Sequence, residues 1–356
     1  MRALVVENDG RLGIRDFPIP LPNDYQVLVR MISCGICNGT DLKLINRKLM
    51  GFDTYPAILG HEGVGTVVKK GKKVVSFEIG DNIIKPRLYE PIDGYYPGFG
   101  GFSEYGLVND LKALAKDGIR PGTKGFSESE ADRTRQIIPP DFDPVSSAMI
   151  NTFCEVLSAF GNFGFQAGES IVIFGCGAVG QSFTRFAAIS GLSPIIVCDI
   201  KEPKLKTAQA MGADNTINSK EEDVKKRVLE ICPKGVDYVV DAVGCTGIIN
   251  QGMKLIKFNG KICVYGISTD LYMQLDWSRG PHNWSLQFIQ LPTYKDEAEA
   301  LSQVIDWIKN GVLVQEDFIT DVVDFDDVID AFDLVMRGKA GKIIVKFPPP
   351  DDSRIH

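Results

Sequence analysis

The chain of 356 residues is 44% hydrophobic and 24% charged, with a formal net charge of −7, which is an ordinary globular composition at a length typical of two domains. The acidic balance, without any basic block, argues against binding to a nucleic acid and against binding to an anionic membrane surface. Since no apolar run is long enough to cross a membrane and the first ten residues are typical of a strand rather than a signal peptide, we expect a cytoplasmic protein.

The first 110 residues predict a β-rich domain, because short β-branched runs alternate with Gly and Pro. The only helical signal there is a turn at 41–46. Residues 86–103 form a loop rich in Gly, Pro and Tyr, and residues 111–138 predict an irregular insertion, for which a solvated surface loop is favoured over a lid. The expected strands are 3–6, 26–32, 63–69, 73–77 and 82–85.

From residue 146 the pattern alternates between helices and apolar strands, which predicts a doubly wound parallel sheet. The C-terminal part predicts one more strand, helices at 296–309 and 326–336, a last strand at 342–347 and a disordered tail at 348–356. The expected strands of the sheet end at 174, 199, 217, 240 and 265, and the helices between them are 178–191, 202–211, 221–231 and one reaching 257.

A glycine motif stands at the centre of this second region. Gly175, Gly177 and Gly180 follow an apolar run, and Asp199 ends the next one. In a strand–turn–helix unit, the first glycine permits a tight turn, the second lets the backbone approach a pyrophosphate, and the third lets helix and strand pack closely. The pyrophosphate would lie at the helix N-terminus. Asp199 can accept from both ribose hydroxyls and would repel a 2′-phosphate, which favours NAD over NADP.

Two short motifs in the first region carry potential metal ligands. Cys34-Gly-Ile-Cys37 is followed by Thr40-Asp41, and His61-Glu62 lies some twenty residues further along. A thiolate, an imidazole and a carboxylate can all bind zinc, and three protein ligands with an open position are the catalytic arrangement. An open position allows zinc to activate an alcohol oxygen. Most of the eight cysteines lie elsewhere, several in apolar runs, and are expected to be reduced.

The order of these features resembles the zinc-dependent medium-chain dehydrogenase/reductase family, which includes alcohol, sorbitol, threonine and glucose dehydrogenases. The resemblance covers almost the whole chain. It implies an α/β fold: a GroES-like, β-rich catalytic domain at 1–150 and 288–356, and a Rossmann NAD-binding domain at 151–287. The motifs that carry it are CGIC…TD, GHEGVGTV, Gly80-Asp81, GGFSEY at 100–105, the glycine motif and the terminal GKIIVK at 341–346.

The resemblance also implies roles for single residues. Cys37 and His61 match the first two zinc ligands, and Glu62 matches a glutamate that binds zinc in some polyol dehydrogenases. Thr40 matches the hydroxyl that relays the alcohol proton, and Asp41 the carboxylate that orients the imidazole. Asp199 and Lys204 match residues that hold the adenosine ribose. The predicted cofactor site comprises Gly175, Gly177, Ala178, Val179, Gly180, Asp199, Ile200, Lys204, Val243 and Gly266.

The sequence departs from the family pattern in three places. One extra residue separates Cys37 from Thr40-Asp41, which leaves the relay geometry open. Asn151 occupies the position of the usual further ligand; because an amide is a poor zinc ligand, zinc would rest on Cys37, His61, Glu62 and water, with Cys154 or Glu155 as substitutes if the alignment is shifted. Residues 86–102 contain no cysteine, so we expect one catalytic zinc and no structural zinc.

The expected function is hydride transfer from a secondary alcohol, of a polyol or sugar-related kind, to NAD⁺. Two alternatives stay open: a zinc-free NAD(P)H-dependent quinone or enone reductase on the same fold, which Asn151 favours, and a non-catalytic NAD(H)-binding protein. A homo-oligomer, dimer or tetramer, is the family expectation, with the sheet edge near 261–267 as its contact.

Overall fold

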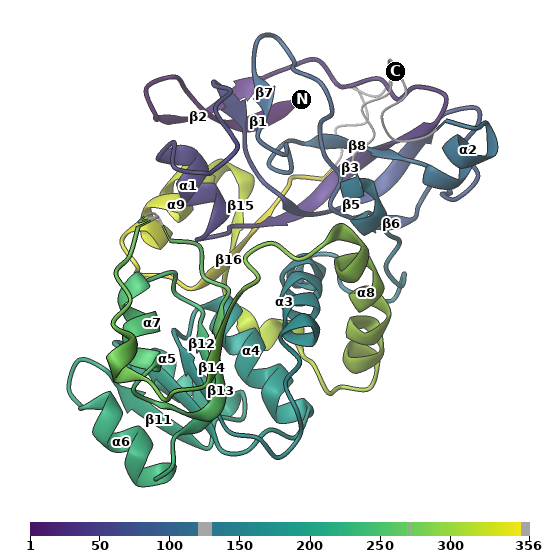
Figure 1. Ribbon diagram of the computed structural model, residues 1–356. Helices are drawn as coiled ribbons and strands as arrows, with labels where there is room; N and C mark the ends of the chain where they lie inside the picture. Colours follow the sequence, from purple (N-terminus) through teal and green to yellow (C-terminus); the bar gives the residue numbers. More distant parts are fainter. Residues whose placement is uncertain (120–129, 269, 271, 350–356) are drawn as a thin grey trace. The chain divides into compact units, whose positions relative to one another are not determined.

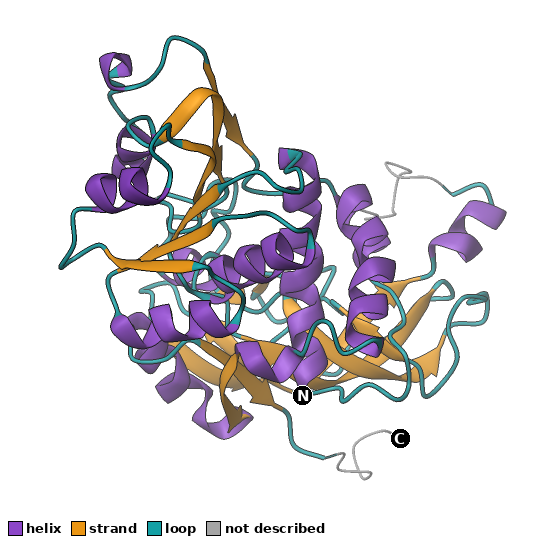
Figure 2. Ribbon diagram, turned by 90° about the horizontal axis from the view of Figure 1, so that it is seen from below, coloured by secondary structure: helices purple, strands orange, loops and turns teal. Residues whose placement is uncertain are grey.

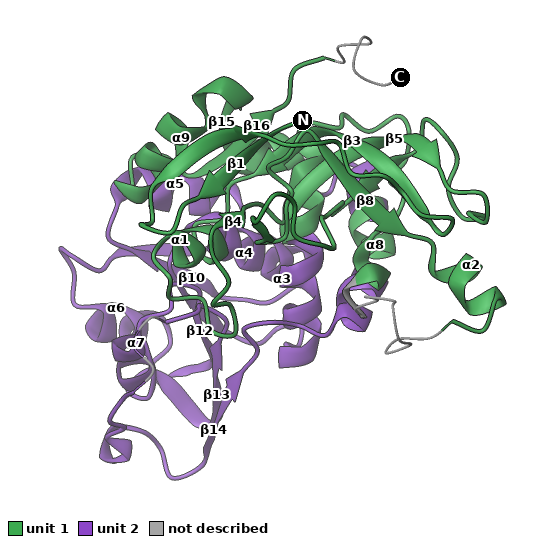
Figure 3. Cartoon of the chain, turned by 90° about the horizontal axis from the view of Figure 1, so that it is seen from above, with its two compact units in different colours: residues 1–152, 301–305, 314–356 green, residues 153–300, 306–313 purple. Residues whose placement is uncertain are grey.

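The structure is a computed structural model, which describes residues 1–119, 130–268, 270 and 272–349 (Figure 1). Parts of two sequence predictions, the insertion at 111–138 and the tail at 348–356, lie outside the described residues. The chain divides into two compact units (Figure 3). The first comprises Met1–Thr152 with Leu301–Ile305 and Val314–His356, and the second comprises Phe153–Ala300 with Asp306–Leu313.

The first unit is built on two sheets. Its larger sheet has the order β15-β16-β3-β5-β6, with β8 paired to β3, and the smaller has the order β2-β1-β4-β7. β3 is almost continuously buried because it pairs with β5, β8 and β16. The strands are β1 (Arg2–Val6), β2 (Leu12–Asp16), β3 (Gln26–Gly35), β4 (Ala57–Ile58), β5 (Glu62–Lys70), β6 (Asn82–Ile84), β7 (Tyr96–Pro97), β8 (Tyr105–Asn109), β15 (Ile319–Asp324) and β16 (Lys342–Lys346).

Helices are few and short in this unit. α1 (Thr40–Ile45), α2 (Leu111–Lys116) and α9 (Val328–Met336) belong to it, and its core joins residues of the N-terminal strands to Phe332 and Val345 near the C-terminus. The last segment of the chain is therefore an integral part of the first unit. Short 3₁₀ helices of this unit lie at Glu130–Thr134, Ser146–Ala148, Gln315–Phe318 and Phe325–Asp327, and the second unit has one at Trp277–Arg279.

The second unit contains a parallel sheet with the order β11-β10-β9-β12-β13-β14. β9 lies centrally, and the chain proceeds outward on either side of it, as in a doubly wound nucleotide-binding fold. The strands are β9 (Ile171–Phe174), β10 (Ile195–Asp199), β11 (Asn215–Asn218), β12 (Val236–Asp241), β13 (Ile256–Val264) and β14 (Trp284–Phe288). The helices of this unit, drawn purple like all helices in Figure 2, are α4 (Ala178–Ile189), α5 (Glu202–Ala210), α6 (Val224–Ile231) and α7 (Thr246–Gly252). Two more helices, α3 (Met149–Phe163) and α8 (Tyr294–Lys309), each have residues in both units (Figure 3).

The predicted fold class, a β-rich GroES-like part and a Rossmann-type parallel sheet, is confirmed. Two predicted elements are wrong. Residues 73–77 form no strand, because the backbone N–H groups of Val75 and Ser76 both donate to Asp110 at 2.6 Å instead of to a neighbouring strand. The helix expected to reach residue 257 ends at Gly252, and β13 already begins at Ile256.

Two further elements were not predicted from the sequence: β14 in the parallel sheet, and the short helix α2 inside the expected irregular insertion. Because β14 pairs with β13, residues 261–264 lie inside the sheet, and the expectation of a sheet edge near 261–267 is wrong. The amino end of α2 is capped by Asp110, whose side chain accepts from two of its backbone N–H groups. Among the described residues, none of the helices combines the length and the apolar character needed to cross a membrane.

Candidate functional site

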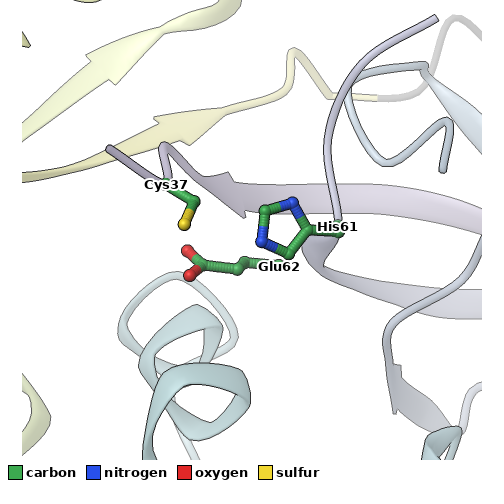
Figure 4. A group of neighbouring side chains, drawn as sticks. All are labelled: Cys37, His61 and Glu62. Carbon is green, nitrogen blue, oxygen red and sulfur yellow. The ribbon is translucent and has the colours of Figure 1, made fainter. Parts of the chain in front are cut away.

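Three potential metal ligands meet at one end of β3 and β5. The ligand atoms of Cys37, His61 and Glu62 all lie within 4.8 Å of one another (Figure 4). The pairing of Gly35 with Glu62 in the two antiparallel strands brings the two motifs together, since Cys37 follows the end of β3 and His61 precedes β5. The structure thus groups the three residues that the sequence predicted as ligands.

Asp41 lies behind two of these side chains and is fully buried. Its Oδ2 accepts from the backbone N–H of Cys37 at 2.9 Å, and its Oδ1 lies 3.3 Å from His61 Nδ1. Burial alone would lower the pKa of His61, but the charges of Asp41 and Cys37 raise it well above its usual value. The other ring nitrogen points towards Cys37 and Glu62 (Figure 4). Asp41 therefore stands where a carboxylate can fix the orientation of a ligating imidazole.

Glu62 is 2% exposed, and both of its carboxylate oxygens accept hydrogen bonds. The hydroxyl of Thr152 donates to Oε1 at 3.0 Å, and the ammonium of Lys342 donates to Oε2. Lys342 is itself only 4% exposed; burial lowers its pKa, but the neighbouring charges of Glu62 and Cys37 outweigh this and raise the pKa. Lys342 and Thr152 are parts of the site that the sequence did not predict.

The other residues that the sequence predicted for this site differ in how they contact the three potential ligands. Thr40 begins α1, and its backbone N–H donates to Cys37 Sγ at 3.4 Å. Asn151 is fully buried; its amide group donates to Ala148 O at 3.0 Å, while its Oδ1 has no hydrogen-bond partner within the described chain. Cys154 and Glu155 are not in the group of ligands found among the described residues.

The loop 86–102 also reaches the site, because the ring of Phe99 packs against that of His61 with centroids 5.4 Å apart. Phe99 has a positive φ of 73°, an uncommon conformation for a side chain of this size. One of the aromatic residues of this loop thus shapes the surroundings of His61.

The second candidate site is the glycine turn after β9. Gly175 has φ +93°, which favours glycine, and a Cβ on Gly180 would overlap the carbonyl oxygen of Gly175. A Cβ on Gly177, by contrast, would meet no described atom within 4 Å. The first and third glycines are therefore required by the fold itself, whereas the second leaves open space at the start of α4, where Ala178 and Val179 follow.

Acidic side chains hold the adjacent turns. Asp199 Oδ2 accepts from the N–H of Cys176 at 2.8 Å and Oδ1 from that of Lys201 at 3.0 Å. Asp241, which sequence reasoning missed, accepts from three successive backbone N–H groups, at Val243, Gly244 and Cys245. Burial raises the pKa of Asp241, and these three N–H groups oppose the shift. Both carboxylates therefore fix loops at the carboxyl ends of strands.

The predicted cofactor residues share one edge of the sheet. Gly175, Asp199, Val243 and Gly266 lie at or just beyond the ends of β9, β10, β12 and β13, which are neighbours in the parallel sheet. Ile200 and Val243 are largely exposed, and the carbonyl of Lys204 accepts from the thiol of Cys176. In open α/β sheets, ligands bind outside the carboxyl ends of the strands, where the strand order reverses.

Comparisons with known proteins agree with this geometry. The family model described as "Alcohol dehydrogenase GroES-like domain" matches residues 23–117, and that described as "Zinc-binding dehydrogenase" matches residues 178–310. A sorbitol dehydrogenase of Bombyx mori is 27% identical over 353 residues, 96% of this chain and 97% of that protein. An L-threonine 3-dehydrogenase of Pyrococcus abyssi is 28% identical, with 92% of each chain covered.

Solved structures show the same fold. The benzyl alcohol dehydrogenase of Acinetobacter calcoaceticus superposes with a TM-score of 0.81 at 21% identity, covering 98% of this chain and 99% of that one. The two family models together match more than half of the chain, and the relatives match it nearly from end to end. The chain therefore belongs to the zinc-type medium-chain dehydrogenase/reductase family, as its motifs predicted, and is an oxidoreductase of the dehydrogenase type.

Proposed function

We propose that the chain is a zinc-dependent dehydrogenase that transfers hydride from a secondary alcohol, of a polyol or sugar-related kind, to NAD⁺. The observation that supports this most directly is the grouping of Cys37, His61 and Glu62 within 4.8 Å. The sorbitol and threonine dehydrogenases among the relatives favour an alcohol substrate. The limits 1–150 with 288–356 and 151–287 remain our prediction for the catalytic and cofactor domains.

The donor set fits a zinc ion. One sulfur, one imidazole nitrogen and one carboxylate match the ligands that zinc takes, and three protein ligands leave a position for substrate. His61 Nδ1 and Asp41 Oδ1 are buried without a well-formed hydrogen bond among the described residues, and a ligated imidazole would donate its N–H to such a carboxylate. When bound there, zinc supplies a Lewis acid that polarises the alcohol oxygen and lowers its pKa.

The residues of the chain have separate roles in this proposal. Cys37, His61 and Glu62 would hold the ion, and Asp41 would keep the His61 ring in the ligating tautomer. The Thr40 hydroxyl takes the proton of the alcohol and passes it towards solvent. The side chain at position 151 is a neutral amide, which is a poor zinc ligand, so Asn151 would not be expected to serve as the further ligand.

The cofactor assignment rests on the second site. The open space at Gly177 allows a pyrophosphate to approach the N-terminus of α4, whose backbone N–H groups favour an anion. The carboxylate of Asp199, fixed by two backbone N–H groups, favours the ribose hydroxyls of NAD over the 2′-phosphate of NADP.

The first experiment is elemental analysis for zinc on protein purified without added metal, combined with NAD⁺ reduction in the presence of sorbitol, xylitol and glucose. We expect about one zinc per chain and NADH formation with at least one of these alcohols. Cys37→Ser should lose both, whereas Cys232→Ser, a control at the end of α6, should lose neither.

Each alternative predicts a different result. Zinc near zero after zinc is supplied, together with NAD(P)H oxidation by a quinone or enone, would establish the zinc-free reductase. NADH binding without turnover of any of these compounds would indicate the non-catalytic binder. A value near two zinc ions per chain would contradict the expectation of a single catalytic zinc.

A further inference from the structure

Glu62 and Lys342 form a buried ion pair inside the candidate metal site. Their side chains are 2% and 4% exposed, and Thr152 Oγ1 contacts both, donating to Glu62 Oε1 at 3.0 Å and lying 3.3 Å from Lys342 Nζ. A buried ion pair is costly to desolvate and contributes little net stability. Stability therefore does not explain why this ion pair includes Glu62, whose carboxylate is also a potential metal ligand.

The strand pairing makes room for the pair. β16 runs antiparallel to β3, with Ile344 opposite Gly35, and β5 lies on the other side of β3 with Glu62 opposite Gly35. A Cβ on Gly35 would lie 2.5 Å from Glu62 Oε2 and 3.0 Å from Lys342 Cε. The ion pair thus occupies the volume that a side chain at position 35 would fill.

A metal ion at Cys37, His61 and Glu62 has to share the Glu62 carboxylate with the ammonium of Lys342. The ammonium withdraws charge from the carboxylate and repels a dication, and in a buried site of low dielectric this repulsion is weakly screened. Thr152, a neutral donor on the other carboxylate oxygen, orients Glu62 without opposing the metal.

We propose that Lys342 is a positioning residue that lowers the zinc affinity of the site by pairing with Glu62, so that zinc is held less tightly than by the same three ligands without a cation. The inference rests on the proposed function, because it requires zinc at this site. Lys342 and Thr152 then have opposite effects on the zinc affinity: the charge of Lys342 lowers the affinity, and the hydroxyl of Thr152 raises it.

The test is the dissociation constant of zinc from the full chain, measured by competition with a chromophoric chelator after the metal has been removed. Lys342→Met removes both the charge and the donor, Lys342→Gln removes the charge but keeps a donor, and Lys342→Arg keeps both. Thr152→Val removes the neutral donor at nearly the same volume. Thermal melting of each metal-free variant shows whether the variant folds. If Lys342→Met does not fold, Lys342→Gln tests the effect of removing the charge.

We expect Lys342→Gln and Lys342→Met to bind zinc about tenfold more tightly than wild type, Lys342→Arg to bind within about threefold of it, and Thr152→Val to bind more weakly. Unchanged or weaker zinc binding by a folded Lys342→Gln variant would overturn the inference and leave the proposed function intact. Failure of the wild-type chain to bind zinc at all would overturn both.

Discussion

The buried carboxylate of Asp41 contacts both of the segments that carry the potential metal ligands, one with Cys37 and the other with His61. Its Oδ1 lies 3.3 Å from Nδ1 of His61, and its Oδ2 accepts from the backbone N–H of Cys37. A single side chain at the start of α1 thereby contacts both the imidazole of His61 and the backbone of Cys37.

We expect Asp41→Asn to weaken zinc binding by about ten- to a hundredfold, the usual effect of removing the partner of a ligating histidine. The amide can keep the contact with Cys37, but it lacks the charge that holds the N–H of His61. Chelator competition measures the affinity, and Asp53→Asn, an exposed aspartate, is the control. An Asp41→Asn affinity equal to that of wild type would show that the contact does not orient His61.

The stability of the metal-free protein should depend on pH through His61. Its pKa in the folded chain is raised well above the usual 6.5, so folding favours the protonated form. This stabilisation is complete below the unfolded-state pKa and is lost as pH rises through the higher folded-state pKa. The melting temperature of metal-free wild type minus that of His61→Gln should therefore be largest near about pH 6 and decrease towards about pH 9. A difference that grows with pH would contradict the assignment.

The sequence predicted those residues of the candidate site that lie close together along the chain. His61 and Glu62 are neighbours in the chain, Cys37 and Asp41 lie within one short segment, and a register of two antiparallel strands brings the two segments together. The glycine motif is likewise local, and its helix and strands follow from hydrophobic periodicity.

Lys342 and Thr152 could not be predicted in this way. They contact Glu62 across 280 and 90 residues of sequence, and nothing local indicates that β16 returns to lie beside β3. The strand predicted at 73–77 is wrong for a related reason: the backbone N–H of Ser76 donates to Asp110, which lies 34 residues further along the chain. These three features depend on contacts between residues far apart in the chain, and a local sequence pattern does not show such contacts.

The glycines of the turn after β9 should separate folding from cofactor binding. Gly177→Ala introduces a Cβ that no described atom opposes, at φ −77°, so we expect stability within about 0.5 kcal/mol of wild type. The same methyl group would occupy the space open to a pyrophosphate, and NADH affinity should fall about tenfold.

Gly180→Ala is the matched comparison. Its Cβ would overlap the backbone oxygen of Gly175, so we expect destabilisation of about 1–3 kcal/mol from overpacking. Thermal melting and NADH fluorescence titration measure both quantities. Unchanged NADH binding by a folded Gly177→Ala variant would remove the glycine turn from the proposed cofactor site.

Asp199 should decide between the two nicotinamide cofactors. The wild-type chain is expected to bind NADH more tightly than NADPH, and Asp199→Asn to reduce that preference about tenfold, since the amide no longer repels a 2′-phosphate. Asp223→Asn is the control, because Asp223 caps α6 and asparagine caps equally well. Titration of each variant with both cofactors gives the ratio, and tighter binding of NADPH by wild type would refute the assignment.

Gly35 should be intolerant of a side chain for a reason that lies in the metal site and not in its backbone conformation. In Gly35→Ala the new Cβ would lie 2.5 Å from Glu62 Oε2, and the buried ion pair of Glu62 with Lys342 has to shift to admit it. We expect a loss of about 1–3 kcal/mol in the free energy of unfolding. Zinc binding should also weaken, because the atom nearest to the new Cβ belongs to Glu62, and the displaced carboxylate is itself a proposed ligand. Gly39→Ala is the control in the same segment, since its Cβ would make an ordinary 3.7 Å contact with Cys37 Sγ and its φ is −75°. Urea unfolding and chelator competition measure the two effects, and a Gly35→Ala variant with wild-type values for both would show that the packing around Glu62 is looser than the distances imply.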